Sequence, residues 1–552
     1  MKKRLLLAKP LFIVLLLAAN FAILPAQRIL YLNSNNVNAG IGVEGNLFTQ
    51  YDSLSAGGRF ESPKGSGIEA IFAQSLWITA RDANDSLYCA ANRYWDYGYD
   101  FFDGPIATTY DSIYDHYYKR VWKVTQQQIA QFRTLTFPTT ANLVDTAILH
   151  WPGKGNPSVL GDFGVNINSA LAPFVDVNGN GIYDPLQGDY PGICGDEGLF
   201  FVYNDARGPH TQSNGKALGI EIRGIANSYT DSTSVAPYAK RAINNTIFVQ
   251  YEIENKSTVN YTSLDVANWV DEDLGCFDND YVGCDTARSL MFAYNGTLMD
   301  PDCAPEKGYG TLPVALGIKM LNQPMNVFGY FTGQGASSPS VSDPITAPQY
   351  RNYCEGFWID TVPFTVGGNG YNGVDPTKFI FPGDPNIANQ WSEVQTHDVP
   401  GDRRMFGGTM HQTFNPGEIK HFDYAFFTSF DSSSDHFSIV DTLKRDADVI
   451  NTFYYDNILP CQAQHVSGIA PVPNNNQFTV SIYPNPANNN ITIESTDNIQ
   501  TIQLMDIEGR VLLHKTIGAT KALIPVNTLA KGVYLLNVQG VGTSVIRKIV
   551  VE

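Results

Sequence analysis

The sequence lacks the motifs by which many hydrolases and metalloproteases are identified. It contains neither the HExxH zinc motif nor the GxSxG nucleophile elbow, and its nine histidines are scattered along the chain. Basic residues are also scarce, because 36 lysines and arginines stand against 54 aspartates and glutamates, a formal net charge of −18. An acidic surface repels phosphate groups, so the composition argues against nucleic acid and anionic lipid as partners.

Cysteine is scarce as well, and no two cysteines have the CxxC spacing of zinc fingers or thioredoxin-like redox sites. The chain has seven cysteines, an odd number, so at least one thiol stays unpaired under oxidising conditions. Cys276 and Cys284 are the nearest pair in the sequence and could close a loop, although spacing alone does not fix the connectivity.

A long apolar run occurs at the N-terminus. Four basic residues within the first nine precede the apolar stretch 11–24, and Ala26 is a small residue suited to cleavage before Gln27. This order is typical of a secretory signal peptide, and the run is short for a membrane span. We expect residues 1–26 to be removed and no transmembrane segment to remain. The polar, Gly/Asn-rich residues 28–48 would then form the exposed start of the mature protein.

The rest of the composition is typical of a mainly β protein with a few short helices. Aromatic residues make up 12% of the chain, and its 48 glycines and 31 prolines favour turns over long helices. Alternation of apolar and polar residues predicts a strand over residues 245–253. Helical spacing predicts a short helix capped by Thr125 and ending near residue 132, and an amphipathic helix over 435–455. The aromatic run 94–102 is expected to pack in a β-sandwich core.

The C-terminal part of the chain has four apolar runs separated by turn residues, which is typical of a small antiparallel β-sandwich. Its motifs lie, in order, at residues 481–487, 506–511, 532–538 and 548–552. This order of motifs resembles the type A C-terminal sorting domain of type IX secretion cargo in the Bacteroidota. The resemblance implies export through the periplasm, with the secretion machinery and a sortase as partners. It also implies possible attachment of the protein to surface polysaccharide.

These features divide the chain into five parts. They are the signal peptide 1–26, an N-terminal β-rich region 27–165, a main β-rich region with acidic loops 166–460, a Pro/Asn-rich linker 461–477, and the sorting domain 478–552. We call residues 27–460 the passenger, and expect it to be multi-domain and β-sandwich-like.

Several short motifs are spread over the passenger. They lie at residues 63–67, 75–77, 176–205, 269–275, 280–286, 294–296, 381–385 and 401–404. Together they resemble a group of tail-bearing secreted proteins of the Bacteroidota for which no activity is established. The resemblance supports a location outside the cell and implies no catalytic residue.

Residues 176–189 have the pattern of a calcium-binding loop. Side-chain oxygens at alternate positions can surround one ion while a glycine, here Gly181 at the sixth position, makes the sharp bend. Gln187 stands where a bidentate glutamate is usual, so a nearby aspartate has to replace it. The expected ligands are Asp176, Asn178, Asn180, Asp184, Asp189 and the carbonyl of Ile182. The alternative is an Asn/Gly-rich turn held by its own side-chain hydrogen bonds.

A second acidic stretch lies between residues 271 and 285 and has three possible interpretations. Its carboxylates belong to Asp271, Glu272, Asp273, Asp278, Asp280 and Asp285. So many like charges repel one another unless a cation or solvent separates them. They could hold a second calcium ion, although their spacing fits no standard loop, or they could form a solvated loop. A carboxylate pair for glycoside hydrolysis would need a defined separation that a sequence does not give.

These observations favour a non-enzymatic protein with a structural, adhesive or ligand-binding role, secreted or attached to the cell surface. Calcium is its expected structural cofactor, and we expect no catalytic residues. The alternative is a secreted hydrolase that acts on polysaccharide through paired carboxylates. Two carboxyl groups about 5–10 Å apart in an aromatic-lined cleft would favour this alternative.

Overall fold

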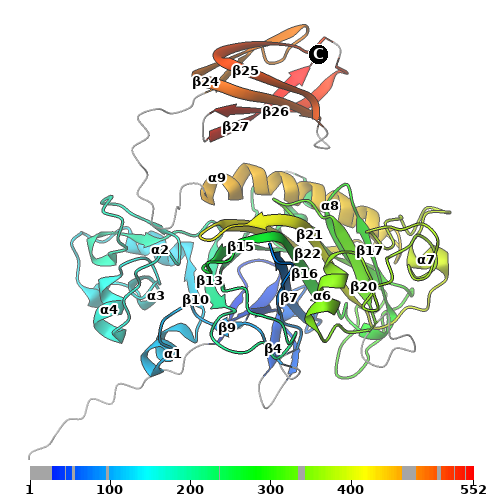
Figure 1. Ribbon diagram of the computed structural model, residues 1–552, viewed down its shortest axis with the longest axis horizontal. Helices are drawn as coiled ribbons and strands as arrows, with labels where there is room; N and C mark the ends of the chain where they lie inside the picture. Colours follow the sequence, from blue (N-terminus) through cyan, green and yellow to red (C-terminus); the bar gives the residue numbers. More distant parts are fainter. Residues whose placement is uncertain are drawn as a thin grey trace, which may run out of the picture.

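The computed structural model describes residues 28–43, 45–51, 56–94, 98–234, 236–332, 342–462, 480–506, 511–527, 529–540 and 543–551. The predicted signal peptide and all but the first two residues of the predicted linker lie outside these described residues. The protein is mainly β, as predicted, and Figure 1 shows its helices packed around the strands. In the described part of the chain, no helix is long and apolar enough to cross a membrane.

The passenger is built on two nine-stranded antiparallel sheets, of which the first has the order β1-β2-β3-β7-β16-β21-β20. In this sheet β6 pairs with β2, and β8 pairs with β7. Its strands are β1 (Ile29–Leu32), β2 (Asn38–Gly42), β3 (Asn46–Leu47), β6 (Phe60–Glu61), β7 (Ala73–Asp82), β8 (Leu87–Ala91), β16 (Tyr261–Asp271), β20 (Val327–Phe331) and β21 (Arg404–Phe414). The expectation of an exposed start over residues 28–48 is therefore wrong, because β1, β2 and β3 are part of this sheet and mostly buried.

The second sheet has the order β10-β13-β14-β15-β22-β19-β18-β17, with β9 paired to β13. Its strands are β9 (Phe102–Asp103), β10 (Trp122–Thr125), β13 (Glu197–Asn204), β14 (Ile220–Ser228), β15 (Thr246–Asn255), β17 (Asp280–Asp285), β18 (Leu290–Asn295), β19 (Val314–Met320) and β22 (Ile419–Phe430). Two small hairpins pair β4 (Thr49–Tyr51) with β5 (Ala56–Gly58), and β11 (Phe174–Val175) with β12 (Tyr190–Pro191). Both large sheets take strands from before and after residue 165, where the sequence analysis places a region boundary.

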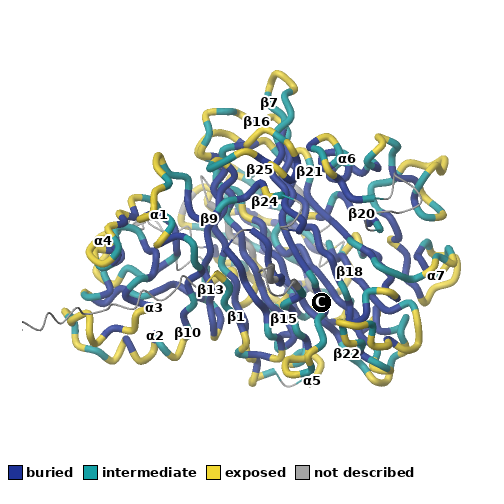
Figure 2. Tube along the Cα trace, turned by 90° about the horizontal axis from the view of Figure 1, so that it is seen from below, coloured by how far each residue is buried: buried dark blue, intermediate teal, exposed yellow. Residues whose placement is uncertain are grey.

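The two sheets pack face to face around one core, which gives the predicted β-sandwich. Alternate residues of β15, Val249 and Tyr251 among them, point into this core because successive side chains of a strand lie on opposite faces. The Tyr251 hydroxyl donates to Oε1 of Gln74 on β7, 3.3 Å away across the interface. Phe48 and Phe426 also meet there, with ring centroids 4.9 Å apart. Figure 2 shows this interior as a block of buried strands with exposed loops around it.

Helices cover the outer faces of both sheets. Helix α6 lies on the first sheet, where its Tyr350 packs against the Trp77 ring of β7 at 4.9 Å. The short helices α1, α2, α3 and α4 pack together on β10 and β13, and we call them the helical lobe. Helix α8, together with α5, covers β22, β19 and β18 (Figure 1). The helices are α1 (Ser112–Tyr118), α2 (Gln126–Phe132), η2 (Ala141–Leu143), α3 (Thr146–Leu149), α4 (Pro157–Phe163), η3 (Pro185–Gln187), α5 (Pro237–Asn244), η4 (Phe277–Asn279), α6 (Ala347–Cys354), α7 (Glu393–Thr396), α8 (Ile439–Phe453), η6 (Tyr454–Ile458) and α9 (Leu459–Gln462).

Three local predictions are confirmed. The strand predicted over 245–253 is β15, and the capped helix is α2, in which Thr125 and Gln128 form a reciprocal capping box. The amphipathic helix is α8, but it begins at Ile439 rather than at 435. The reason is that the Asp435 carboxylate accepts hydrogen bonds from the next backbone amides and holds residues 435–438 in a turn.

The tail forms a separate five-stranded sheet with its own apolar core, which agrees with the predicted small antiparallel domain. The strand order is β23-β24-β26-β27, and β25 also pairs with β24. The strands are β23 (Val480–Tyr483), β24 (Asn490–Asp506), β25 (Val511–Pro525), β26 (Gly532–Gly540) and β27 (Thr543–Val551). Residues 507–510 of the second tail motif lie outside the described residues.

Two disulfides join distant segments, Cys194 to Cys461 and Cys276 to Cys303. The possible Cys276–Cys284 pair is therefore wrong. Cys284 lies on β17 with its side chain buried in the core, while Cys303 comes from a loop that folds back beside Cys276. Cys89, Cys284 and Cys354 are buried free thiols.

Candidate functional site

A cavity of about 650 Å³ lies on the outer face of the second sheet, over β14, β15 and β22. The helical lobe packs on β10 and β13 on one side of it, and α8 packs on β22, β19 and β18 on the other. The first covering extends to Ile225 on β14 and the second to Phe248 on β15, and the cavity lies between them. The volume is in the range of small-molecule sites.

The floor of the cavity is set by strand register. Ile225, Gln250 and Asp423 lie directly opposite one another on the three strands, in one row across the sheet. A second row on the same face lies two residues away on each strand and consists of Arg223, Glu252 and His421. Both rows line the cavity, so its floor carries amide, carboxyl, guanidinium and imidazole groups.

The roof comes from the end of the passenger. Tyr454 and Tyr455 belong to the π-helical turn η6, and Leu459 belongs to α9. The disulfide from Cys194 to Cys461 ties α9 to the segment before β13, and Cys194 itself lines the wall. Turns of π-helix are rare and frequently occur at functional sites.

Asp423 is a buried carboxyl group at the floor of the cavity. Its side chain is almost completely buried, and burial raises the pKa of its carboxyl to about 6. The Tyr454 hydroxyl donates to Oδ2 of Asp423 at 2.6 Å and so connects roof and floor. Next to it, Nε of Arg223 pairs with Glu252 at 3.0 Å and its Nη1 pairs with Glu254 at 2.7 Å.

Gln250 presents a hydrogen-bond donor at the centre of the floor. Its side chain is 6% exposed, and its Oε1 accepts from Nδ2 of Asn227 at 3.1 Å. Its Nε2 has no hydrogen-bond partner among the described residues. A buried donor left in this condition costs about 1–3 kcal/mol, so a ligand oxygen at this point would be favourable.

In the predicted calcium loop, the aspartates are brought together but bind backbone amides. The Asp176 carboxylate accepts from the N–H groups of Gly179 at 2.7 Å and Gly181 at 2.6 Å. The buried Asp189 accepts from the N–H groups of Val177 and Asp184, both at 2.8 Å. These bonds are the turn-stabilising pattern of the alternative interpretation. Oδ1 of Asp176 accepts a second bond from Asn180 N–H at 3.2 Å, so Oδ2 of Asp176 and the two oxygens of Asp189 are the ones that keep a lone pair for a cation.

The remaining expected ligands of this loop are arranged as follows. Asn178 and Asn180 are exposed, and Asp184 caps η3 by accepting from Leu186 N–H at 3.1 Å. In the described part of the chain, two groups of three acidic or histidine side chains have ligand atoms within 4.8 Å of one another, and neither contains a residue of this loop. Calcium at residues 176–189 therefore remains a prediction.

The second acidic stretch is not a solvated loop. Asp271, Glu272 and Asp280 are buried, and only Asp278 of the six acidic residues is fully exposed. Burial raises the pKa of Asp271 to about 6 and holds the pKa values of Glu272 and Asp280 well above their usual range. Asp285, the last of the six, pairs with Arg288 at 2.8 Å.

One of the two close groups contains Asp402, which the sequence analysis did not connect with the acidic stretch. We call Asp271, Asp273 and Asp402 the acidic cluster. The strand pairing of β16 with β21 sets Asp271 opposite Arg404 and so brings residue 402 beside it. The only sequence signal was the motif at residues 401–404.

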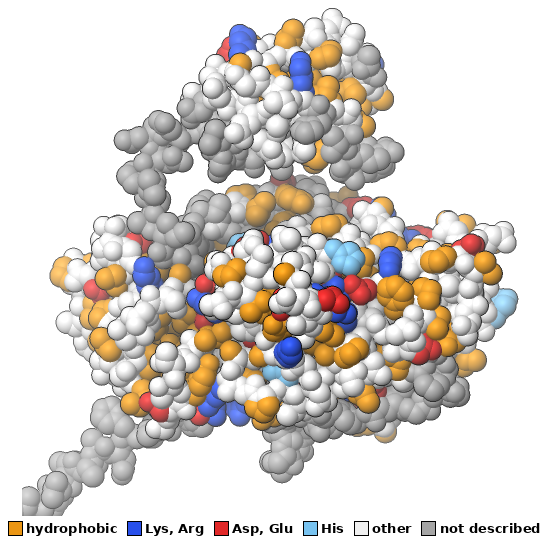
Figure 3. Space-filling view, in the orientation of Figure 1, with side chains coloured by type: hydrophobic (Ala, Val, Ile, Leu, Met, Phe, Trp, Pro, Cys, Tyr) orange, Lys and Arg blue, Asp and Glu red, His pale blue; other side chains and the backbone are white. Residues whose placement is uncertain are grey.

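On the face seen in Figure 3, exposed acidic and basic side chains are scattered among uncharged ones.

Comparison with known families identifies the tail. Residues 481–552 match the model described as "Secretion system C-terminal sorting domain", which confirms the resemblance seen in the sequence. A search of curated proteins found no match.

Among solved structures, the chain is similar to a polysaccharide lyase at 10% identity, over 70% of this chain and 40% of that one, with a TM-score of 0.19. It is also similar to PorZ, described as a surface component of the type-IX secretion system of Porphyromonas gingivalis. That likeness has 11% identity over 94% of this chain and 50% of that one, with a TM-score of 0.13. The chain spans half or less of either protein, and likenesses this weak carry no argument about function.

The buried carboxyl of Asp423 makes a measurable prediction. The pKa of Asp423 is raised from 3.8 to about 6 in the folded protein. The protonated carboxyl therefore stabilises the folded protein fully below pH 4, and this contribution is lost as the pH rises through 6. At about 1.4 kcal/mol per pH unit, the loss is about 3 kcal/mol. Between pH 4 and pH 7, the free energy of unfolding of Asp423→Asn should therefore fall by about 3 kcal/mol less than that of the wild type. Denaturant titrations followed by tryptophan fluorescence at several pH values measure the difference, and parallel profiles would contradict the assignment.

Proposed function

With a type IX sorting domain at its C-terminus the chain is cargo for that secretion system, and we propose that its passenger binds carbohydrate in the cavity of the second sheet. In this proposal the protein acts outside the cell or on its surface as a binding protein rather than an enzyme. Removal of the tail by a sortase and attachment to surface polysaccharide are part of the same proposal.

The observation that carries the proposal is the chemistry of the cavity lining. Sugars present apolar C–H faces that pack on aromatic rings, and hydroxyls that both donate and accept hydrogen bonds. Phe200, Tyr454 and Tyr455 supply rings, and the unpartnered Nε2 of Gln250 supplies a buried donor toward the cavity. Further amide groups at the lining belong to Asn227, Asn322 and Gln462. A mostly apolar wall with a few polar groups is the usual form of a ligand site.

The hydrolase alternative is favoured by one observation in the same cavity. Glu252 and Asp423 lie diagonally on neighbouring strands, and such positions are typically about 7–8 Å apart. This spacing of the two positions is compatible with the carboxyl separation of about 6.5–9.5 Å in inverting glycosidases. Both groups are already engaged, however, Glu252 by Arg223 and Asp423 by the Tyr454 hydroxyl. We therefore rank binding before catalysis.

Removal of the Gln250 donor should weaken carbohydrate binding. The purified protein is screened on a glycan array, and affinity for the best glycan is measured by calorimetry. Gln250→Leu should lower the affinity about tenfold, the effect of one buried hydrogen bond, while Gln131→Leu on the exposed face of α2 should not. Absence of glycan binding by the wild type would contradict the proposal. Release of new reducing ends that Asp423→Asn abolishes would establish the hydrolase instead.

Deletion of residues 478–552 should keep the passenger in the periplasm without unfolding it. The reason is that the described residues of the tail form their own core and sheet, and none of them belongs to the core clusters of the passenger. Cell fractionation with an antibody against the passenger locates the truncated protein, and circular dichroism of the purified passenger tests its fold. Normal surface display of the truncated protein would contradict the role of the tail.

We also propose that calcium binds at residues 176–189 and stabilises the passenger. Phe174 and Tyr183, 5.4 Å apart, anchor the loop to the core of the helical lobe, so order in the loop is transmitted to that core. Calcium at 100 times its dissociation constant adds about 2.7 kcal/mol for one site, which shifts a melting curve visibly. Asp176→Ala should lose this part of the calcium-dependent shift, and Asp375→Ala at an exposed loop position should keep it. Equal shifts in wild type and Asp176→Ala would leave the loop as a turn only.

A further inference from the structure

We propose a second divalent-cation site, of the calcium type, at the acidic cluster of Asp271, Asp273 and Asp402. Asp271 ends β16, Asp273 follows it, and Asp402 precedes β21, the strand that pairs with β16. One carboxylate oxygen from each of the three lies within 4.8 Å of the other two. Oxygen atoms at such separations can share one ion, since calcium–oxygen distances are about 2.3–2.6 Å.

An independent observation is the condition of Glu272, the residue between two members of the cluster. It is 0% exposed, and neither of its carboxylate oxygens has a hydrogen-bond partner in the described part of the chain. Oδ1 of Asp280 is also buried without a hydrogen bond, whereas Oδ1 of Asp271 lies 3.3 Å from Nε of Arg404. The oxygens of Glu272 and Oδ1 of Asp280 are acceptors, so the group they lack is a cation or a proton.

The basic residues at the site do not balance these charges. Arg404 contacts Asp271 at 3.3 Å and Asp402 at 2.6 Å. The neighbouring Arg403 is committed to Glu393, 2.9 Å away. The single charge of Arg404 therefore stands against the three carboxylates of the cluster, two of which it contacts. A divalent ion supplies two further charges, and carboxylate oxygens are the ligands that calcium prefers.

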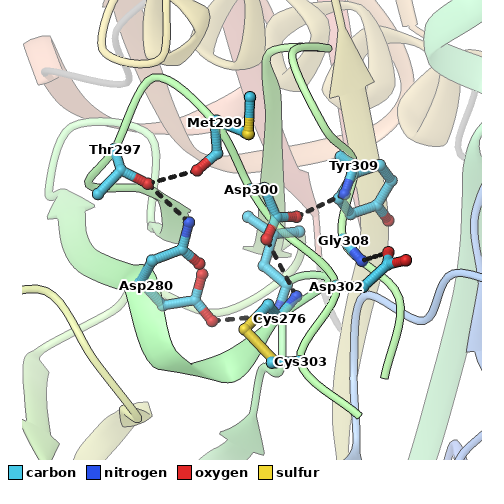
Figure 4. The surroundings of a disulfide bond; sticks show 11 residues. Cys276, Asp280, Thr297, Met299, Asp300, Asp302, Cys303, Gly308 and Tyr309 are labelled. Carbon is cyan, nitrogen blue, oxygen red and sulfur yellow. Dashed lines mark hydrogen bonds between the residues drawn. A yellow bond between two sulfur atoms is a disulfide. The ribbon is translucent and has the colours of Figure 1, made fainter. Parts of the chain in front are cut away.

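The loop that follows the cluster is held rigidly. Figure 4 shows Asp280 and Asp300 beside the disulfide that joins Cys276 and Cys303. The Asp300 carboxylate accepts from the N–H groups of Tyr309 at 2.6 Å and Cys276 at 3.2 Å. Asp280 accepts from Leu274 N–H at 3.0 Å. The carboxylates of Asp280 and Asp300 are therefore held in place beside the disulfide by backbone hydrogen bonds.

Two aromatic side chains make the site observable. The Tyr94 hydroxyl donates to Oδ2 of Asp271 at 2.5 Å, and the Tyr94 ring lies 5.4 Å from that of Trp269. Terbium is a luminescent substitute for calcium, and it is excited by energy transfer from a nearby tyrosine or tryptophan. Terbium at the acidic cluster should therefore emit when these rings are excited, and calcium should displace it.

The experiment uses the full chain with Asp176→Ala as background, so that the first loop does not contribute. Terbium chloride is titrated with excitation of the aromatic residues, and calcium competition is measured in the same cuvette. Asp273→Asn and Asp402→Asn should each lower terbium and calcium affinity at least tenfold, and Asp375→Asn should leave it unchanged. Circular dichroism of each variant tests whether it is folded.

Calorimetry of calcium binding gives a second readout that separates the two sites. The wild type should bind two ions, Asp176→Ala should bind one at the cluster, and Asp402→Asn should bind one at the loop. Equal terbium affinities in Asp402→Asn and Asp375→Asn would overturn the proposal, and protons would then be the partners of the buried oxygens. That result would not bear on calcium binding at residues 176–189, which the Asp176→Ala variant tests separately.

Discussion

The second sheet is buried on both faces, and the rest of the passenger depends on how this is achieved. Along β15, Val249 and Tyr251 face the first sheet, whereas Phe248 and Gln250 face outward. The residues that face inward, such as Val249 and Tyr251, are buried by one continuous surface, that of the first sheet. The outward-facing residues need a covering as wide as the sheet, and the helical lobe alone extends only to Ile225 on β14. Two separate coverings meet the sheet from its two edges, and the cavity is the gap between them.

This arrangement explains which parts of the fold were predictable from the sequence. The strand β15 and the helices α2 and α8 are specified by residues close together in the chain, through alternation, a cap or helical spacing. The pairing of β16 with β21 joins residues more than a hundred positions apart and leaves no local pattern. The same holds for residues 28–48, whose Gly/Asn-rich composition suggested an exposed start although β1, β2 and β3 pair within the first sheet.

The candidate sites divide in the same way. The loop at residues 176–189 was recognisable as a candidate because its oxygen-bearing side chains lie close together in the chain. The cavity was not, since Gln250, Asp423 and Tyr454 meet only after three elements are packed. The acidic stretch from Asp271 was noticed, but its burial and its neighbour Asp402 follow from tertiary structure alone. Local chemistry can be read from a sequence, whereas convergence of side chains from distant elements cannot.

The destination given by the tail and the chemistry of the passenger agree with each other. Buried, unpaired carboxylates such as Glu272 destabilise a fold unless protons or cations compensate them. Outside the cell, calcium sites with dissociation constants of ~10⁻⁴–10⁻³ M are sufficient. The disulfides Cys194–Cys461 and Cys276–Cys303 likewise persist only in an oxidising compartment. If both cation sites bind as proposed, the passenger reaches full stability only after export, because the conditions that compensate its acidic interior exist where its sorting domain sends it.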